Sequence, residues 1–361
     1  MTRRPWVLGQ RGDGAWLESA PTDYETAGVS RVAGSSAVDR LAAHARTTFG
    51  SEVVTDIGGF GGLFALPPSS RRESSLVVAS TDGVGTKSLL CTAAGDYRSI
   101  GLDLVAMNVD DIVVYGARPL FLLDYLVVGT VIPEMVEDIV AGIAEGCRQV
   151  GCALLGGEVA EHPGTMAPGE FDLAGFVVGS VDSDALITGG AIVAGDVVVG
   201  IAAAGMRSDG FSFVRKIFAD TALDAPAYPT ADHSLLEELI RPSRIYTPTV
   251  LDVIDRVDVH GVAHVTGGGI ATNLSRVLPD GVDALVHRGR WPIPPIFAEM
   301  RRVSGVAAEA LEESLPIGIG MLLVVRAGDA AAVIEACVAA GHEAYDIGEI
   351  IDGGGNARFV D

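Results

Sequence analysis

The apolar positions of this chain fall into short runs separated by glycine-rich turns, and the runs have two kinds of spacing. Unbroken runs rich in β-branched residues predict strands at SLVVAS (75–80), CALLGG (152–157), DLAGFVVGSV (172–181), DVVVGIAAAG (196–205), GIGMLLVV (318–325) and AYDIGEII (344–351). Apolar residues at helical spacing predict helices over 35–48, 133–151, 208–218 and 329–341. The alternation of the two kinds of element predicts an α/β or α+β fold.

Two stretches without periodicity divide the chain. Residues 1–20 predict an irregular extension, and the turn-rich stretch 182–195 predicts a domain boundary. We therefore expect an N-terminal domain over 21–184 and a C-terminal α/β domain over 185–361, as the length of 361 residues also favours.

One predicted helix is apolar on nearly every side and still carries acids. The stretch SIGLDLVAMNVDDIVVYGARP (99–119) includes Asp103, Asn108, Asp110 and Asp111. Asp103 and Asp110 are seven residues apart, which places them on one helix face about 10 Å apart. Buried carboxylates are costly unless they meet a cation, a metal or hydrogen-bond donors, so this helix is expected to face a charged site.

Composition narrows the class of protein. A formal charge of −22 argues against a nucleic-acid surface, since phosphate backbones are bound by clusters of Lys and Arg. The apolar runs are too short to span a membrane, no signal-peptide core is evident, and four cysteines without a C-x-x-C pair predict reduced, buried thiols in a cytoplasmic protein. Lysine occurs only at Lys87 and Lys216, which makes the lysine of a glycine-rich loop notable.

That loop, STDGVGTK (80–87), has the ingredients of a phosphate-binding loop in the wrong order. A Walker A loop needs its lysine and hydroxyl directly after the second glycine, and here Thr86 precedes Lys87 and Asp82 stands in front. The alternative is that carboxylates hold nucleotide phosphates through Mg²⁺, which prefers hard oxygen ligands. The candidate residues are Asp82, Asp103, Asn108, Asp110, Asp111, Glu158 and Glu161. They would converge if the strands that carry Asp82 and Glu158 are neighbours.

A second glycine-rich turn predicts an anion site. In AHVTGGGIATNLSRVL (263–278), Thr266 and three glycines precede a helical run, whose free amides suit a phosphate. His264 precedes this turn and is a candidate general acid or base. His342 has no accompanying chemistry in the sequence.

These motifs, in this order, resemble those of the aminoimidazole ribonucleotide synthetases, also called phosphoribosylformylglycinamidine cyclo-ligases. The resemblance runs from YETAGVS (24–30) to YDIGEI (345–350) and is carried by DGVGTK, GLDLVAMNVDDIVVYGARPLFLLDY, GIAEGC, LLGGEVAE, GEFDLAGFVVG, SDGFSFVRK, AHVTGGG and GIGM. It implies a two-domain PurM-like fold whose N-terminal mixed sheets pair across a homodimer into a barrel-like interface. It also implies that ATP, with Mg²⁺, phosphorylates the formyl amide oxygen of formylglycinamidine ribonucleotide, after which the amidine nitrogen closes the imidazole ring and phosphate leaves.

The resemblance also implies residue roles. The catalytic set would be His264, Lys87 and Asp111. ATP would meet Gly59, Gly61, Asp82, Gly83, Thr86, Lys87, Asp103, Asn108, Gly157 and Glu158. The metal would be held by Asp82, Asp110, Asp111 and Glu158, and the ribotide phosphate by Ser208, Thr266, Gly267, Gly268 and Gly269.

Several positions depart from the family pattern. The departures are Asp110 for Asn, Val159 for Thr, His162 for Met, Arg207 for His, and Leu315 with Pro316 for Phe-Asn. Two alternatives therefore stand beside the cyclo-ligase. One is another enzyme of the same superfamily, either a paralogue that uses ATP to activate a different amide or ribotide or an enzyme such as a thiamine-phosphate kinase or a selenophosphate synthetase. The other is a nucleotide-binding homologue without catalysis.

Overall fold

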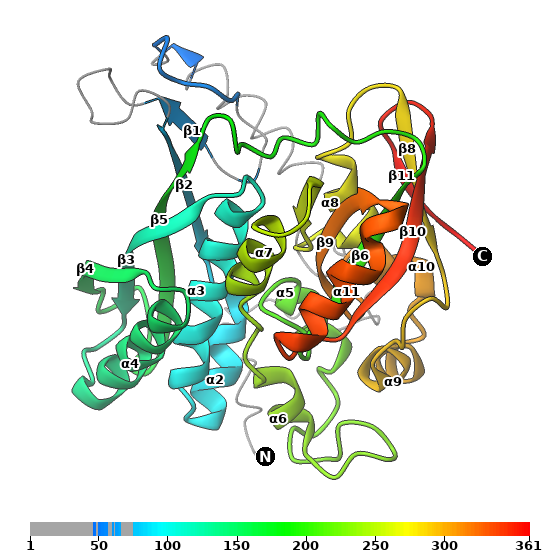
Figure 1. Ribbon diagram of the computed structural model, residues 1–361. Helices are drawn as coiled ribbons and strands as arrows, with labels where there is room; N and C mark the ends of the chain where they lie inside the picture. Colours follow the sequence, from blue (N-terminus) through cyan, green and yellow to red (C-terminus); the bar gives the residue numbers. More distant parts are fainter. Residues whose placement is uncertain (1–45, 48–49, 57–59, 61, 66–74) are drawn as a thin grey trace.

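The computed structural model describes residues 46–47, 50–56, 60, 62–65 and 75–361, which form two lobes, each built on its own β-sheet (Figure 1). The predicted extension 1–20 and nearly all of the predicted helix 35–48 lie outside the described residues. The first sheet ends at Asp182 and the second begins at Asp196. Within the described ranges, no helix is long and apolar enough to cross a membrane.

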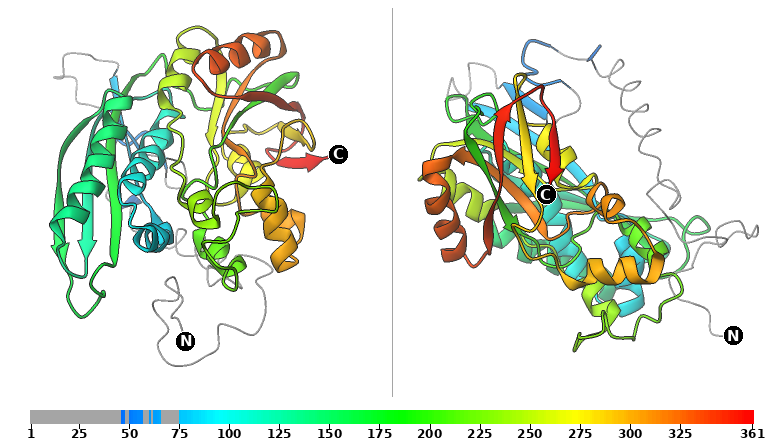
Figure 2. Two further views of the ribbon diagram at one scale, coloured as in Figure 1. Left: turned by 90° about the horizontal axis from the view of Figure 1, so that it is seen from below. Right: turned by 90° about the vertical axis from the view of Figure 1, so that its right-hand side faces the viewer.

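The N-terminal lobe is a five-stranded mixed sheet with helices on one face. Its strands are β1 (Gly62–Ala65), β2 (Ser75–Gly83), β3 (Arg118–Val128), β4 (Ala153–Glu161) and β5 (Phe171–Asp182), in the order β1-β2-β5-β3-β4. Only β3 and β4 are parallel. The helices are α2 (Ser88–Ala94), α3 (Arg98–Val113) and α4 (Pro133–Gln149). Seen from below, α3 (cyan) lies between the strands and the second lobe (Figure 2, left).

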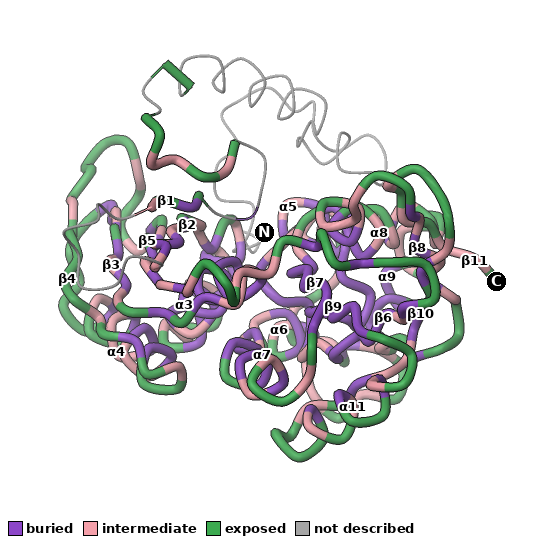
Figure 3. Tube along the Cα trace, turned by 45° about the horizontal axis from the view of Figure 1, so that its top comes forward, coloured by how far each residue is buried: buried purple, intermediate pink, exposed green. Residues whose placement is uncertain are grey.

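The C-terminal lobe is a six-stranded sheet between helices. Its strands are β6 (Asp196–Ala202), β7 (Val259–His264), β8 (Val282–His287), β9 (Ile319–Arg326), β10 (Ala344–Asp352) and β11 (Ala357–Val360), in the order β11-β8-β10-β6-β9-β7. The helices are α5 (Phe211–Ile217), α6 (Leu235–Ile240), α7 (Thr247–Ile254), α8 (Gly269–Ser275), α9 (Pro295–Ser304), α10 (Ala308–Glu312) and α11 (Ala330–Ala339). The strand β9, which lies between β6 and the edge strand β7, is buried over nearly its whole length, as expected of a strand covered on both faces (Figure 3).

Most predicted elements are present, and two differ in an informative way. The strand predicted over 75–80 continues to Gly83, so Asp82 is the last but one residue of β2. The apolar run 172–181 is typical of a strand buried on both faces, but burial alternates along β5, because α3 and α4 cover only one face of this sheet. By contrast, α3 is buried along nearly its whole length, as its sequence predicts (Figure 3).

The acids of α3 find their partners in the second lobe and in the loop after β2. Asp103 forms an ion pair with Lys87 at 2.6 Å, and neither side chain has exposed area. Asp103 also accepts a hydrogen bond from the backbone N–H of Ser243, and Lys87 donates to the carbonyls of Arg207 and Arg241. Asp110 accepts four hydrogen bonds from Tyr246 and Thr247 at the start of α7. These contacts join residues 241–247, which we call the clamp segment, to the N-terminal lobe.

We predict that Lys87→Met lowers the free energy of unfolding by about 3–5 kcal/mol, because it leaves the Asp103 carboxylate buried without its cation. Chemical denaturation monitored by circular dichroism measures this change. The matched control is Arg98→Met, which removes the exposed ion pair of Arg98 with Glu145 and should cost no more than about 1 kcal/mol. Adding Asp103→Leu to Lys87→Met should recover part of the loss. Equal costs for the two single variants would contradict the structural importance of the buried pair.

Candidate active site

Residues from both lobes meet at the C-terminal end of β2. Ser80 and Asp82 belong to β2, Asn108 and Asp111 to α3, and His264 ends β7 in the second lobe. Ser80 donates to Asp111 at 3.2 Å, and His264 Nδ1 lies 2.7 Å from the other oxygen of the Asp111 carboxylate. The site is therefore assembled across the junction of the lobes.

Asp82 is held in place by its own strand end and by α3. The side-chain oxygen of Asn108 accepts from the backbone N–H of Asp82, and its amide donates to the Asp82 carbonyl. One Asp82 carboxylate oxygen accepts from Gly83 N at 2.7 Å. The other oxygen has no partner of this kind in the hydrogen bonds of the described residues, so it can receive a ligand.

A chain of contacts runs from Asp111 through His264 to Arg207. His264 has no exposed area, and burial, with the Arg207 guanidinium second, lowers its pKa to about 3. Arg207 can only donate, so the contact between its Nη2 and His264 Nε2 makes Nε2 the acceptor. The imidazole proton therefore lies on Nδ1 and is donated to Asp111. Both ring nitrogens are engaged, so in this arrangement His264 positions Asp111, and the acid–base role predicted for it would require one of these contacts to open.

Three carboxyl groups lie close to one another at this junction, and the nearby cations do not neutralise them fully. Burial, and then the charge of Asp111, raises the pKa of Asp82 to about 6, and burial raises that of Asp111 to about 7. Burial, followed by the charge of Asp82, raises the pKa of Asp209 to about 6. Oδ2 of Asp209 is buried and has no hydrogen-bond partner among the described residues. This excess of negative charge suits a cation.

The described residues contain no group of three or more His, Cys, Asp or Glu side chains that could hold a metal by themselves. Mg²⁺ does not need one, because it is commonly bound through one or two carboxylates, with the remaining positions taken by water and substrate phosphates. Asp82 and Asp111 fit such a site. Sequence reasoning missed Asp209, although it lies inside the SDGFSFVRK motif, because nothing in the motif shows that α5 points its N-terminal side toward β2.

Other residues predicted for the metal and nucleotide are placed elsewhere. The Asp110 carboxylate accepts hydrogen bonds from the start of α7, and Asp103 and Lys87 form a buried ion pair. A ligand would therefore reach these three side chains only if those contacts opened. Glu158 lies on β4, and the strands β5 and β3 separate β4 from β2. The condition for Glu158 and Asp82 to converge is therefore not met within one chain, and the neighbouring Gly157 lies on β4 with Glu158. Gly59 and Gly61 lie outside the described residues.

The residues predicted to bind phosphate border the same junction. Ser208 is buried with no hydrogen-bond partner for its Oγ among the described residues, and the Thr86 hydroxyl lies 3.3 Å from that of Ser212. In the TGGG turn, Thr266 donates to Asn273, and Gly269 N donates to the Thr266 carbonyl. Gly268 and Gly269 have positive φ angles, and a Cβ on Gly269 would lie 1.9 Å from the Glu312 carbonyl oxygen, so only glycine fits there.

Arg276 is a further cation near the site that the sequence did not single out. Its guanidinium lies over the Phe60 ring, 5.0 Å from the centroid, and the Phe60 carbonyl accepts from Ser80. Its charge also lowers the pKa of Asp111 against the effect of burial. Arg276 thus places an exposed positive charge beside the carboxylates.

Family models match both lobes. The model described as AIR synthase related protein, N-terminal domain, matches residues 66–181, and the corresponding C-terminal domain matches residues 193–361. A phosphoribosylformylglycinamidine cyclo-ligase of Brevibacillus brevis is 47% identical over 329 residues, which cover 91% of this chain and 95% of that protein. The protein of the same name from Myxococcus xanthus is 44% identical over 342 residues and covers 94% and 99%.

Solved structures share the fold at lower identity. A thiamine-monophosphate kinase from Stenotrophomonas maltophilia has a TM-score of 0.60 at 20% identity, covering 89% of this chain and 94% of that one. AaThiL, solved in complex with AMPPCP and TMP, also has a TM-score of 0.60, at 15% identity, covering 90% and 92%. At these identities the likeness concerns the fold.

We predict that stability falls as pH rises from about 4 to 7. Asp111, Asp82 and Asp209 have raised pKa values, so each favours a folded state that binds more protons than the unfolded state, by about 1.4 kcal/mol per pH unit while it titrates. The lowered pKa of His264 acts in the opposite direction but is one group against three. Asp111→Asn removes one titrating carboxyl and also the charge that raises the pKa of Asp82, so the free energy of unfolding should depend less on pH. Urea unfolding from pH 4 to 8 measures it, with the exposed Asp138→Asn as control. An unchanged slope in Asp111→Asn would contradict the assignment.

Proposed function

The chain belongs to the AIR synthase related family and, within it, to the phosphoribosylformylglycinamidine cyclo-ligases, and we propose that it carries out the reaction for which these relatives are named. It is an ATP-dependent ligase that closes the ring of formylglycinamidine ribonucleotide to give aminoimidazole ribonucleotide, a step of purine biosynthesis. The observation that carries this conclusion is identity of 43–47% to cyclo-ligases over nine-tenths of the chain, across both lobes. No observation on the site favours the paralogue or the non-catalytic alternative.

Mg²⁺ and ATP are the cofactor and co-substrate that we propose for this site. Asp82 and Asp111 would hold the metal, since both are carboxylates kept close together with insufficient cationic partners, and Asp209 adds negative charge on the opposite lobe. Bound Mg²⁺ would neutralise phosphate oxygens of ATP. Asn108 and Gly83 would hold Asp82 in place, so these residues would orient the metal ligand.

The ribotide phosphate would lie against Ser208 and the turn from Thr266 to Gly269. Three observations support this: an unpartnered buried hydroxyl, glycines whose conformations other residues rarely adopt, and the nearby exposed guanidinium of Arg276. Arg207 is not available for this purpose. It has no exposed area, its guanidinium packs 5.2 Å from the Tyr246 ring centroid, and it contacts His264.

The residues at the junction need not include a nucleophile, because the substrate carries its own. We propose that ATP transfers its terminal phosphoryl group to the formyl oxygen of the substrate. The amidine nitrogen then attacks the activated carbon, and the C–O bond breaks with release of phosphate. The neutral His264 and the buried Arg207 would keep Asp111 in place during these steps.

A homodimer through the N-terminal sheets is a further part of the proposal. The face of this sheet opposite α3 and α4 exposes Phe64, Tyr125 and Phe176, with 41%, 45% and 41% of each residue accessible. Register places Phe176 beside Leu123, and Tyr125 two residues further along the same strand. A contiguous exposed apolar face on a sheet favours a protein interface.

We predict that the purified protein, given ATP, Mg²⁺ and formylglycinamidine ribonucleotide, releases ADP and phosphate in equal amounts together with aminoimidazole ribonucleotide. A coupled ADP assay and colorimetric detection of the aminoimidazole measure the products. Asp82→Asn should lower kcat/KM at least about a hundredfold and weaken Mg²⁺-dependent ATP binding, because one of the proposed metal ligands is lost. Asp138→Asn on the exposed face of α4 should leave both unchanged. ATP turnover without an imidazole product would refute the cyclo-ligase assignment.

We predict that Phe176→Lys makes the protein monomeric, because it places a charge in the middle of the apolar face of β5. Size-exclusion chromatography with light scattering gives the mass. The control is Val338→Lys on α11 of the other lobe, where the side chain is also exposed, at 58%. If the dimer persists in Phe176→Lys and dissociates in Val338→Lys, the interface lies on the C-terminal lobe and the proposal is refuted.

A further inference from the structure

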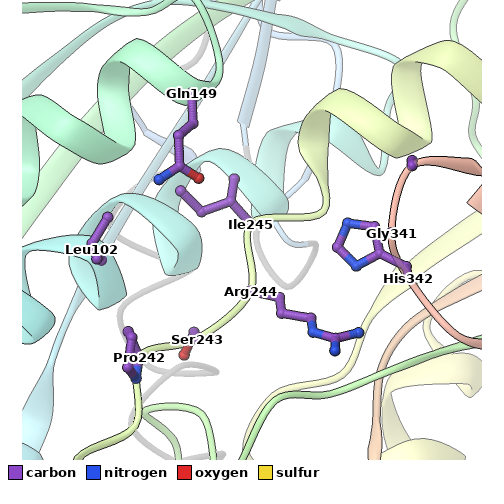
Figure 4. A pocket seen from close by; sticks show the side chains of 9 residues that line it. Leu102, Gln149, Pro242, Ser243, Arg244, Ile245, Gly341 and His342 are labelled. Carbon is purple, nitrogen blue, oxygen red and sulfur yellow. The ribbon is translucent and has the colours of Figure 1, made fainter.

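A pocket of about 300 Å³ lies between α3, the end of α4 and the second lobe (Figure 4). Its walls come from four parts of the chain: Leu102 of α3, Gln149 at the end of α4, the clamp segment at 242–245, and the turn 340–342 after α11. None of the residues assigned to the active site lines it. The pocket is large enough for a small metabolite.

Three polar side-chain atoms of this pocket lack partners. Ser243 Oγ, Arg244 Nη1 and His342 Nδ1 are buried and have no hydrogen-bond partner among the described residues. Ser243 is only 7% exposed, so its hydroxyl cannot exchange freely with bulk water. Figure 4 shows the Arg244 side chain extending toward the His342 ring. Buried donors of this kind are costly unless something satisfies them.

The lining is also unusual in charge. The chain as a whole carries a formal charge of −22, yet none of the nine lining residues is acidic. The Asp103 carboxylate, which accepts from the backbone N–H of the lining residue Ser243, is already paired with Lys87. Leu102, Pro242 and Ile245 supply apolar contact beside the three polar groups. Lining residues that carry a guanidinium, a hydroxyl and an imidazole suit an oxyanion attached to a small apolar body.

We propose that this pocket binds a small molecule through a phosphate or carboxylate group, which Arg244, Ser243 and His342 recognise. The site is separate from the site for ATP and the ribotide. Binding here does not depend on the proposed function, whereas the effect on catalysis described next rests on it.

The clamp segment connects the pocket with the active site. The clamp segment supplies Ser243 and Arg244 to the pocket. In the same segment, the Arg241 carbonyl accepts a hydrogen bond from Lys87, and the backbone N–H of Tyr246 donates to Asp110. The Tyr246 ring lies 5.7 Å from the His342 ring and 5.2 Å from the Arg207 guanidinium, which contacts His264. An occupant that orders the clamp segment therefore acts on the residues that position Asp111.

The test is isothermal titration calorimetry of the full-length protein with inorganic phosphate and, separately, with acetate. Arg244→Gln should raise the Kd of the pocket at least about tenfold, because the charged donor is lost. Ala340→Met, at the exposed rim, should also weaken binding by filling the space without removing charge. Ser208→Ala, in the proposed ribotide phosphate site, should leave the pocket unaffected. If Arg244→Gln weakens the binding of phosphate and not of acetate, the pocket recognises a phosphate group. If it weakens the binding of acetate and not of phosphate, the pocket recognises a carboxylate.

Unchanged affinity for both anions in Arg244→Gln and Ala340→Met would overturn the proposal, as would complete loss of anion binding in Ser208→Ala. Thermal unfolding and circular dichroism of each variant confirm that it is folded. In the cyclo-ligase assay, the bound anion should change the KM for ATP in the wild-type protein and not in Arg244→Gln. If the protein proves to have no cyclo-ligase activity, the calorimetry still decides whether the pocket binds anions.

Discussion

The structure depends on the hydrogen bonds and the ion pair that stabilise carboxylates on a buried helix. α3 packs between the N-terminal sheet and the second lobe, and it still carries three carboxylates. Water cannot reach them well, so their partners must come from the protein. Asp103 takes Lys87 and the Ser243 amide, and Asp110 takes the first amides of α7. The second lobe is held against the first because it supplies the backbone donors of Ser243, Tyr246 and Thr247.

The adjacent residues Asp110 and Asp111 show how one helix serves both stability and chemistry. Successive residues on an α-helix point about 100° apart. Asp110 accordingly faces α7 and has three donor groups, whereas Asp111 faces the end of β2 and has a hydroxyl and a neutral imidazole. Burial raises the pKa of Asp111 to about 7, and its few partners leave it able to bind a cation. Neighbouring residues of one helix thus serve the junction of the lobes and the proposed metal site.

Local pattern was sufficient to predict much of this fold. The amphipathic helix from Pro133, the buried character of α3 and the strand that delivers Asp82 all follow from spacing and composition within a dozen residues. Local pattern does not determine arrangements that depend on residues far apart in sequence. Strand order separates Glu158 from Asp82, and the loop lysine turns inward because its partner Asp103 is on the next long helix. Asp209 and the pocket around Arg244 could be recognised only once the lobes were placed together.

The burial of Lys87 has one more consequence. The chain has two lysines, and the ammonium group of Lys87 is enclosed by Asp103 from one lobe and by backbone carbonyls from the other. An amine-directed reagent can modify it only when the lobes part, since no part of the side chain is accessible while they are joined. The rate of modification at this residue would therefore report how often the two halves of the enzyme separate.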